Sequence, residues 1–455
     1  MTDSVWSTLL PHRLEEVFEW HDQPGALQRL LPPWERVEVV ASSGHIRAGA
    51  EVHLQMRVGP LVSRWHARHG VYEPPHHFED EAVKSPFAFW RHSHHFCTVT
   101  EGTSLEDRVR WRLPFHRAVS WLLTPWVQRR LDAMFAFRHR RTQEDLARLS
   151  RYGSNEPITV AITGSSGLVG QNLSALLSTG GHRVISLVRR DSSGDHEVKW
   201  DPRDSAMDLS ALHGVDVVVH LAGEPLAAGR WSRERKHAIM ESRRQGTANL
   251  ASALARMSTP PKTLISASAI GWYGDREQPV DERAEQGEGF LSDVCEAWER
   301  ATVTAHEAGI RVVTPRIGVV LDPKHGALGK MLPIWRAGLG GPVGSGEQGF
   351  SWVALDDLLA AMLLMMTNSE LQGPVNVVSP QKTSNIQFAK ALGRVLGRPA
   401  LVPVPRLAIE LLYGQMGRET VLSGAFVVPH KLSEAGFEWS QPDLEDALRF
   451  ILGRS

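Results

Sequence analysis

Several features of secreted, membrane and nucleic-acid-binding proteins are missing from this sequence of 455 residues. It contains only two cysteines, Cys97 and Cys295, which excludes a disulfide framework and suits a reducing compartment. The formal net charge is −1, which argues against nucleic acid or an anionic membrane as the principal partner. No uncharged apolar run reaches the roughly 18 residues of a membrane-spanning helix, and the first residues lack a signal-peptide pattern. We therefore predict a cytoplasmic protein without a membrane span.

Length and composition indicate several globular domains. A content of 42% hydrophobic and 22% charged residues is ordinary for a globular protein, and 455 residues exceed one typical domain. Residues 1–150 hold 8 of the 15 tryptophans and 13 of the 21 histidines, and the helix-breaking stretch Gly153–Pro157 follows them. We predict domains at residues 1–150, 157–400 and 401–455.

Short strands dominate the predicted secondary structure of the first domain. Alternating apolar residues, such as Val52 and Met56, are typical of strands with one buried face. The predicted strands are Val37–Val40, Glu51–Val58, Arg64–Val71, Phe78–Val83, Trp90–Val99 and Thr103–Trp111. Helices are predicted before them at Leu14–Trp20 and Ala26–Leu31, and after them over residues 119 to about 149.

Three phrases of this domain point to a family: Tyr72–Pro75, Phe78–Glu81 and Pro86–His92. They resemble the START-like superfamily of polyketide cyclases and ligand-transport proteins. The resemblance implies an α+β helix-grip fold, in which a curved antiparallel sheet surrounds the long helix and leaves a cavity for an apolar ligand. Aromatic-rich walls suit such pockets. The alternative is that the tryptophans Trp65, Trp90 and Trp111 only form a packed core.

Histidines gather within the same domain. His92, His94 and His95 lie on one predicted strand, and His76 and His77 precede another. Imidazoles two residues apart share a strand face and could ligate a metal ion. Because histidines at a cavity mouth or on the surface explain the pattern equally well, we predict no metal site.

The stretch Ile158–Gly170 predicts a nucleotide-binding turn, since an apolar strand-like run is followed by three glycines and a helix pattern. Gly164 permits the tight exit from the strand, Gly167 lets a pyrophosphate approach the backbone, and Gly170 lets the helix pack closely. The motif predicts cofactor contacts at Gly164, Ser165, Ser166, Gly167, Leu168 and Val169.

Strands and helices alternate from Ile158 onward, which predicts the α/β class and a Rossmann-type, doubly wound parallel sheet. The second strand, Val184–Val188, precedes a third that begins at Asp216. The loop after the third strand lies at the edge where such sheets bind ligands. We therefore add Leu221, Ala222 and Gly223 to the predicted cofactor site.

Two arginines follow the second strand, at the position of the residue that reads the ribose, about 20 residues past the last glycine of the turn. NAD-specific versions of the fold carry an acid there, which binds the 2′-hydroxyl and repels a 2′-phosphate. The guanidinium groups of Arg189 and Arg190 instead suit phosphate. We predict NADP(H) as the cofactor. The alternative is that both arginines are solvated and that Asp191 turns inward.

The motifs of this domain resemble the extended short-chain dehydrogenase/reductase family. The segments are Thr163–Gly170, Leu221–Gly223, Ser266–Gly274 and Trp352–Asp357. A closer likeness, carried by Gly223–Leu226, Phe290–Ser292, Pro315–Leu321 and Gly344–Gln348, is to the "epimerase family protein" subgroup, also labelled cell-division inhibitors. This likeness implies that Ser266 and Arg316 contact the cofactor. The tail, Val404–Leu452, resembles the small helical domain that closes the substrate cleft of this subgroup.

The catalytic Tyr and Lys pair of the sugar-converting family members is missing. In those members the Lys lowers the pKa of a Tyr four residues before it, so that the phenol acts as a base. The corresponding segment, Phe290–Cys295, contains neither residue. Ser268 matches the family's carbonyl-polarising hydroxyl, and Tyr273 follows on the next loop, so we name both as candidate catalytic residues.

Charged residues follow the third strand of the nucleotide-binding domain, at the edge that binds ligands. They are Glu224, Arg230, Lys236 and Arg243, and we predict that some of them hold an anionic small-molecule substrate. Three functions stay open. The domain could be an oxidoreductase or epimerase of unknown substrate, the chain could be a catalytically silent dinucleotide-binding sensor or scaffold, or the first domain could deliver an apolar ligand. The oligomeric state is not predicted.

Overall fold

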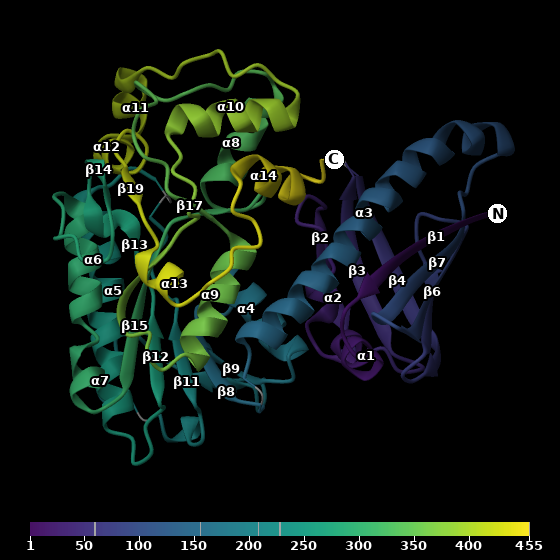
Figure 1. The fold of residues 1–455 in the computed structure, drawn as a ribbon, viewed down its shortest axis with the longest axis horizontal. Helices are drawn as coiled ribbons and strands as arrows, with labels where there is room; N and C mark the ends of the chain where they lie inside the picture. Colours follow the sequence, from purple (N-terminus) through teal and green to yellow (C-terminus); the bar gives the residue numbers. More distant parts are fainter. Residues whose placement is uncertain (59–60, 155, 208, 227–228, 455) are drawn as a thin grey trace. The chain divides into compact units, whose positions relative to one another are not determined.

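The computed structural model describes residues 1–58, 61–154, 156–207, 209–226 and 229–454. The chain forms two compact units (Figure 1). The first contains Met1–Arg151, Ala175–Gly181 and the C-terminal segment from Phe450, and the second contains Tyr152–Ser174 and His182–Arg449. Polar residues and helix breakers predict a linker over Arg138–Pro157, but Arg138–Tyr152 is the end of helix α3 (Arg117–Tyr152), so that part of the prediction is wrong. Residue 155 lies outside the described residues. Within the described ranges, no helix is both long enough and apolar enough to cross a membrane.

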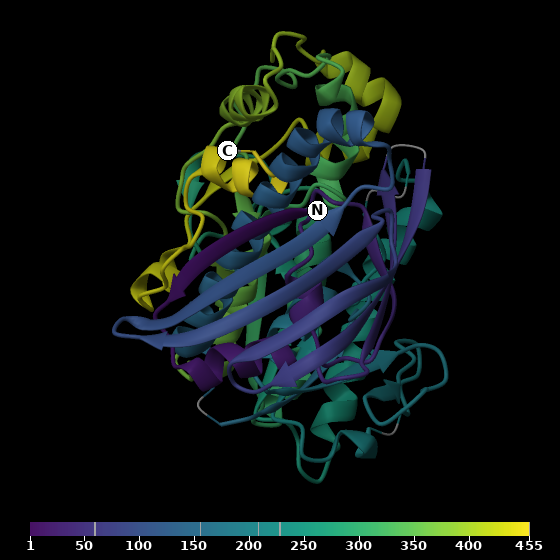
Figure 2. The ribbon, with the colours of Figure 1, turned by 90° about the vertical axis from the view of Figure 1, so that its right-hand side faces the viewer.

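The first unit is built on a seven-stranded antiparallel sheet in the order β1-β7-β6-β5-β4-β3-β2 (Figure 2). Its strands are β1 (Thr2–Leu10), β2 (Val37–Ser42), β3 (Glu51–Val58), β4 (Leu61–Glu73), β5 (His77–Lys84), β6 (Phe89–Val99) and β7 (Gly102–Arg112). Helices α1 (Leu14–Asp22) and α2 (Ala26–Arg29) follow β1, and α3 (Arg117–Tyr152) follows the sheet. The predicted helix-grip arrangement is confirmed.

Strand β1 is missing from the sequence-based prediction. Its inward-facing positions include polar residues, such as the buried Ser4, so the sequence shows no apolar alternation there. Its partner β7 also lies far along the chain.

The core between the sheet and α3 joins Val127, Leu131 and Phe135 of the helix to Trp90 and other sheet residues. Each large apolar side chain that is fully buried in this way contributes roughly 1.5–3 kcal/mol. The long helix therefore holds the curved sheet.

The second unit contains a parallel sheet in the order β10-β9-β8-β11-β12-β15, with β13 and β18 also paired to β15. The strands are β8 (Thr159–Thr163), β9 (Arg183–Val188), β10 (Glu197–Lys199), β11 (Val217–His220), β12 (Thr263–Ser266), β13 (Ser268–Ala269), β15 (Arg311–Ile317) and β18 (Gly373–Val377). The strand order changes direction between β8 and β11, and ligands bind at such a point in Rossmann sheets. The doubly wound fold is confirmed.

Helices alternate with these strands. They are α4 (Leu168–Thr179), α5 (Arg233–Ala255), α6 (Phe290–Arg300), α7 (Val303–Glu307), α8 (Gly326–Arg336), α9 (Leu355–Thr367) and α10 (Asn385–Leu396), with short 3₁₀ turns at η1 (Ser210–Leu212) and η2 (Ile270–Tyr273). The sequence predicts one helix over Ser292–Ala308, but the structure breaks it between α6 and α7. At the break the Thr302 hydroxyl donates to the carbonyl oxygen of Glu299 at 2.7 Å, a local bond that competes with helix continuation.

The tail is less purely helical than the sequence predicts. It contains α11 (Arg406–Tyr413), α12 (Gln415–Thr420), β19 (Ala425–Val427), α13 (His430–Glu434) and α14 (Leu444–Leu452). Strand β19 pairs in parallel with β14 (Arg276–Val280), while β16 (Val319–Leu321) pairs with β17 (Trp352–Ala354). The strand of the tail is only three residues long, which is too short for a clear alternation in the sequence.

Candidate functional site

The glycine turn connects β8 to α4. Gly164 has a φ of +67°, in the left-handed region that favours glycine. A Cβ on Gly170 would lie 2.3 Å from the carbonyl oxygen of Gly164, so the packing of the helix against the turn has no room for a side chain. Ser166 and Gly167 are exposed at the start of α4, where free N–H groups and the helix dipole favour an anion. The turn can therefore hold a pyrophosphate.

Thr163 connects this turn to the end of the neighbouring strand. Its hydroxyl accepts hydrogen bonds from the N–H groups of Leu221 and Ala222 at 3.1 and 3.2 Å, and it lies 2.7 Å from Nδ1 of His220. His220 Nε2 lies 3.0 Å from the hydroxyl of Thr247. Burial lowers the pKa of His220 to about 4, so its ring is neutral at neutral pH. No sequence motif points to this connection, because its members come from three separate elements.

The loop that follows β11 lies against the glycine turn. A Cβ on Gly164 would lie 3.0 Å from the backbone nitrogen of Ala222, and a Cβ on Gly223 would lie 3.2 Å from Cζ of Arg243. Arg243 is buried, and its guanidinium donates to the carbonyl oxygens of Glu224 at 3.1 Å and Ile239 at 3.3 Å. The structure thus brings together the two predicted cofactor loops and one of the predicted substrate residues.

The two arginines after β9 have different surroundings. Arg190 donates to Glu197 at 2.8 Å, and Asp191 accepts from Lys199 at 2.7 Å. Lys199 holds the pKa of Asp191 below its usual value. Arg189 is exposed and forms no ion pair within the described part of the chain. Of the residues after β9 that could contact the ribose or its 2′-phosphate, Arg189 is therefore the one whose guanidinium has no ion-pair partner among the described residues. Asp191 is bound to Lys199.

Ser268 and Arg316 meet at one half-buried carboxylate. The hydroxyl of Ser268 donates to Glu299 Oε1 at 2.7 Å, and Arg316 donates to both oxygens of Glu299 at 2.8 Å. The Arg316 guanidinium also lies 3.9 Å from the ring centroid of Trp272. Its charge is satisfied by protein groups. Ser266 ends β12, and its buried hydroxyl has no hydrogen-bond partner among the described residues.

Tyr273 is fully buried, close to the same cluster. Its phenol donates to Asn376 Oδ1 at 2.6 Å and accepts from Arg316 at 3.1 Å. Burial raises the pKa of Tyr273 to about 12, although Arg316 acts in the opposite direction. A catalytic base would need a lowered pKa. In this arrangement Tyr273 serves as a structural hydrogen-bond partner, and a catalytic role would require its release from Asn376.

The remaining predicted substrate residues divide into two groups. Glu224 pairs with Arg235 at 3.0 Å, near the cofactor loop. Lys236 Nζ donates to Gln415 of the tail at 3.1 Å, and a Cβ on Gly414 would lie 3.4 Å from the guanidinium of Arg230. The start of α5 therefore meets the tail between α11 and α12, which brings two of the predicted cations to the tail.

A cavity of about 550 Å³ occupies the first unit. Its wall is mostly apolar and includes Trp65 and Trp90 from the sheet and Leu131 and Met134 from α3. This volume lies within the range of roughly 300–1,000 Å³ that is typical of small-molecule pockets. Trp111 instead packs in the core. The tryptophans thus divide between the two predicted roles.

Part of this wall is polar. The polar wall consists of His21, His69, Asp80, His92, His94 and Arg138. Behind it, the buried carboxylate of Asp107 lies 2.9 Å from His92 Nε2 and 2.6 Å from His139 Nε2. His94 Nδ1 is 2.7 Å from the same carboxylate, without the alignment of a hydrogen bond. Asp107 is thus surrounded by three imidazoles.

These imidazoles differ in pKa. Burial lowers the pKa of His94 to about 3 and that of His21 to about 4. Burial also acts on His92, but its hydrogen bonds to Asp107 and Asp80 outweigh that effect and raise its pKa. The polar wall therefore holds neutral histidines beside one that favours the charged form.

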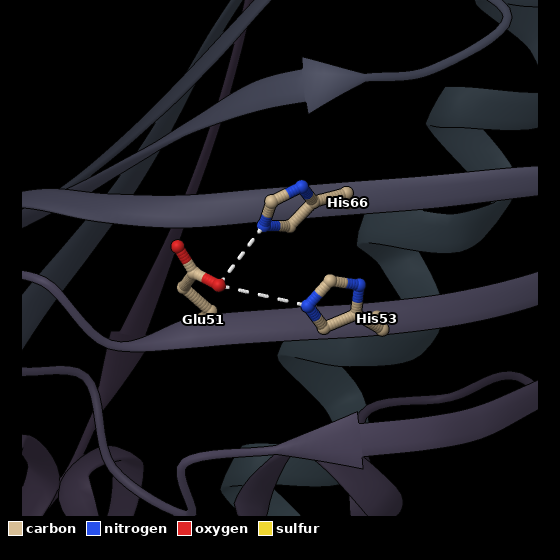
Figure 3. A group of neighbouring side chains, drawn as sticks. All are labelled: Glu51, His53 and His66. Carbon is tan, nitrogen blue, oxygen red and sulfur yellow. Dashed lines mark ion pairs between the residues drawn. The ribbon is translucent and has the colours of Figure 1, made fainter.

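A second histidine cluster, Glu51, His53 and His66, lies on β3 and β4 (Figure 3). Glu51 Oε2 is 3.6 Å from His53 Nε2 and 3.3 Å from His66 Nε2 (Figure 3). Neighbouring residues in both strands line the cavity, so by alternation this cluster faces away from it. The spacing could hold a metal ion, as could that of Asp80, His92 and His94. However, Arg68 already pairs with Glu51 at 2.7 Å.

Three segments match known protein families. Residues 160–378 match the NAD dependent epimerase/dehydratase family, and residues 404–451 match a domain of unknown function, DUF1731. Residues 10–137 match the polyketide cyclase / dehydrase and lipid transport family. Both resemblances inferred from sequence motifs are therefore confirmed.

Individual relatives agree with these matches. An epimerase family protein of Mycobacterium bovis is 39% identical over 296 residues, which cover 65% of this chain and 98% of the relative. The crystal structure of a nucleoside-diphosphate sugar epimerase from Corynebacterium glutamicum superposes with a TM-score of 0.82 at 34% identity, over 99% of this chain and 90% of that chain. Human epimerase family protein SDR39U1, crystallised with NADPH, has a TM-score of 0.61 and 31% identity, over 65% and 99% of the two chains. With its glycine turn, parallel sheet and tail, the chain belongs to the NAD dependent epimerase/dehydratase family, among its epimerase family proteins.

Proposed function

We propose that the second unit binds NADP(H) at the carboxyl edge of its parallel sheet and uses it to reduce, oxidise or epimerise a small molecule. The observation that carries the choice of cofactor is the difference between Arg189 and its neighbours: Arg190 and Asp191 are paired, while the Arg189 guanidinium is exposed and without an ion pair among the described residues. NADPH in the human relative supports the same choice. A charged hydrogen bond to the 2′-phosphate contributes about 1.5–3 kcal/mol.

The test is a titration of the full chain with NADPH and NADH, in which cofactor fluorescence measures binding. We expect NADPH to bind at least about 10-fold more tightly, since 1.4 kcal/mol corresponds to a factor of ten. The Arg189→Ala variant should lose this preference. Arg300→Ala, an exposed arginine paired with Glu296 on α6, is the matched control and should keep it. Equal affinities for the two cofactors in the wild-type chain would refute the assignment.

For catalysis we propose Ser268 as the residue that polarises the substrate. Its hydroxyl donates a hydrogen bond to Glu299, which Arg316 holds in place, so polarising a substrate oxygen requires this hydroxyl to turn from Glu299 to the substrate. Tyr273 stays a second candidate, although its raised pKa makes it a poor base. Full turnover in a Ser268→Ala, Tyr273→Phe variant would remove both. NADPH binding without turnover of any substrate would favour the silent sensor or scaffold instead.

The tail contacts this side of the unit at two points: Lys236 donates to Gln415, and the N–H of Leu291 donates to Glu419. These contacts support a tail that covers the substrate.

A second function is favoured by the cavity of the first unit. We propose that it binds an apolar small molecule, because its volume and its aromatic wall suit such a ligand. Mass spectrometry of material extracted from the purified full chain tests this proposal. A bound apolar compound is expected, and an empty cavity that also fails to take up added apolar probes would contradict it.

A further inference from the structure

Arg138 stands out among the residues of the polar wall. It lies on α3 and lines the cavity, and its Nε is buried without a hydrogen-bond partner. Among the residues that the structure describes, its guanidinium makes no ion pair; its Cζ lies 5.4 Å from the ring centroid of Phe135. A half-buried cation without an ion-pair partner is costly.

Other arginines of the same unit are paired. Arg130, which also lines the cavity from α3, binds Glu35 at 2.6 Å. Arg29 and Arg148 are buried, and they bind Asp145 at 2.7 and 2.9 Å. The fold therefore supplies a carboxylate partner to another arginine of the cavity lining and to two buried arginines of the same unit. Arg138 differs from them in that no protein carboxylate reaches it within the described chain.

The nearby acids are already engaged. Asp107 is held by His92 and His139, and Asp80 lies 3.5 Å from His92 Nδ1. These two carboxylates influence Arg138 electrostatically but lie beyond ion-pair distance. Burial lowers the pKa of Arg138, and the attraction of Asp107 and Asp80 offsets this only in part. Its remaining donors point to a group that the protein itself does not provide.

We propose that Arg138 binds the carboxylate of an amphiphilic ligand whose apolar body fills the cavity. The inference rests on the proposed ligand-binding function of the first unit. A carboxylate matches the planar fork of a guanidinium in a bidentate pair. A cationic head group would be repelled by Arg138, and a neutral one would leave its charge uncompensated. A phosphate monoester carries about −1.5 to −2 charges, which the carboxylates of Asp80 and Asp107 disfavour more strongly than a single negative charge.

Dodecanoate and 1-dodecanol test the proposal, because they share one apolar chain and differ in the head group. Each is titrated into the full chain below its aggregation limit and followed by calorimetry. We expect dodecanoate to bind at least about 10-fold more tightly than dodecanol. Arg138→Gln should remove this preference while dodecanol binding is kept, which also shows that the variant is folded. Arg140→Gln, on the same helix but outside the cavity lining and paired with Glu144 at 2.7 Å, is the control and should keep the preference.

Two results would overturn the inference. If both probes bind the wild-type chain equally, the cavity takes an apolar ligand but Arg138 does not select a carboxylate. The same holds if Arg138→Gln still prefers dodecanoate. If neither probe binds the wild-type chain, the ligand-binding function of the first unit fails together with the inference. The dodecanol measurement therefore distinguishes the two failures.

Discussion

The two candidate sites are built in different ways. The nucleotide edge of the second unit is formed by backbone: a turn with a positive φ at Gly164, a close approach at Gly170 and the exposed residues Ser166 and Gly167. The cavity of the first unit is formed by side chains, with buried charged and polar groups around Asp107. A backbone site is lost when a side chain is added at a glycine, whereas a side-chain site is lost when one member of a buried polar group is removed. The two sites should therefore fail to different kinds of substitution.

The largest expected effect is on the stability of the first unit. Asp107→Asn removes the charge of a buried carboxylate that binds both His92 and His139. Removing one partner of a buried charged pair lowers the free energy of unfolding by about 3–5 kcal/mol. Tryptophan fluorescence during urea unfolding measures it, because 8 of the 15 tryptophans lie in residues 1–150. The equivalent change at an exposed pair of the same unit, Asp3→Asn, which removes the partner of Arg110, is the control and should alter stability far less. Equal losses in both variants would contradict the proposed role of the buried group.

Acidification should also act on the first unit. His21 and His94 have folded pKa values of about 4 and 3, below their usual value of 6.5, so the unfolded chain binds more protons at acid pH. Their contribution is fully present above pH 6.5 and is lost as the pH falls towards 4, at up to about 1.4 kcal/mol per pH unit for each histidine. The raised pKa of His92 acts in the opposite direction, since its contribution is present below pH 6.5 and declines above it.

Urea unfolding of the wild-type chain between pH 7.5 and 4.5 measures this dependence. A His94→Asn variant has one fewer buried histidine to titrate and should show a shallower loss of stability. A first-unit transition that is independent of pH would show that these histidines are not neutral in the folded state.

A smaller effect is expected at the backbone site. In Gly170→Ala the new Cβ would lie 2.3 Å from the carbonyl oxygen of Gly164, so the turn must shift, at a cost of about 1–3 kcal/mol. NADPH affinity should fall about 5- to 150-fold while dodecanol binding is unchanged. Gly194→Ala is the matched control, because a Cβ there meets nothing within 4 Å. Unchanged NADPH affinity in Gly170→Ala would mean that the turn does not form the site.

The smallest effect is expected at Arg190. Its guanidinium is bound to Glu197 and Ser193, so Arg190→Ala should weaken NADPH binding less than Arg189→Ala does, by about 3-fold or less. Parallel titrations of the two variants decide the order. A larger loss at Arg190 would show that the cofactor draws this arginine away from Glu197.

The sequence predicts the backbone site better than the side-chain site for a physical reason. Glycines at Gly164, Gly167 and Gly170 are local, and their spacing identifies the turn before any tertiary contact is known. The cluster around Asp107 joins β6, β7 and α3, and only the tertiary fold brings these elements together. Likewise, Glu299 unites Ser268 with Arg316 although no motif gives it that role.

Secondary structure shows the same division. Strands with clear alternation, such as β3, and the long helix α3 follow from the sequence. Strand β1 depends on pairing with β7, and the break between α6 and α7 depends on a local bond of Thr302. The division into domains at 1–150, 157–400 and 401–455 stays a prediction. Limited proteolysis near Gly153–Pro157, with two folded products, is its expected outcome.

The central claim is that one chain carries two independent sites, one for NADP(H) in the second unit and one for an apolar carboxylate in the first. The most direct test titrates the wild-type chain, Arg189→Ala and Arg138→Gln with NADPH, NADH and dodecanoate. Arg189→Ala should lose its preference for NADPH over NADH and bind dodecanoate as the wild-type chain does. Arg138→Gln should keep the preference for NADPH and bind dodecanoate more weakly than the wild-type chain. A variant that impairs both ligands, or a wild-type chain that does not distinguish NADPH from NADH, would contradict the account.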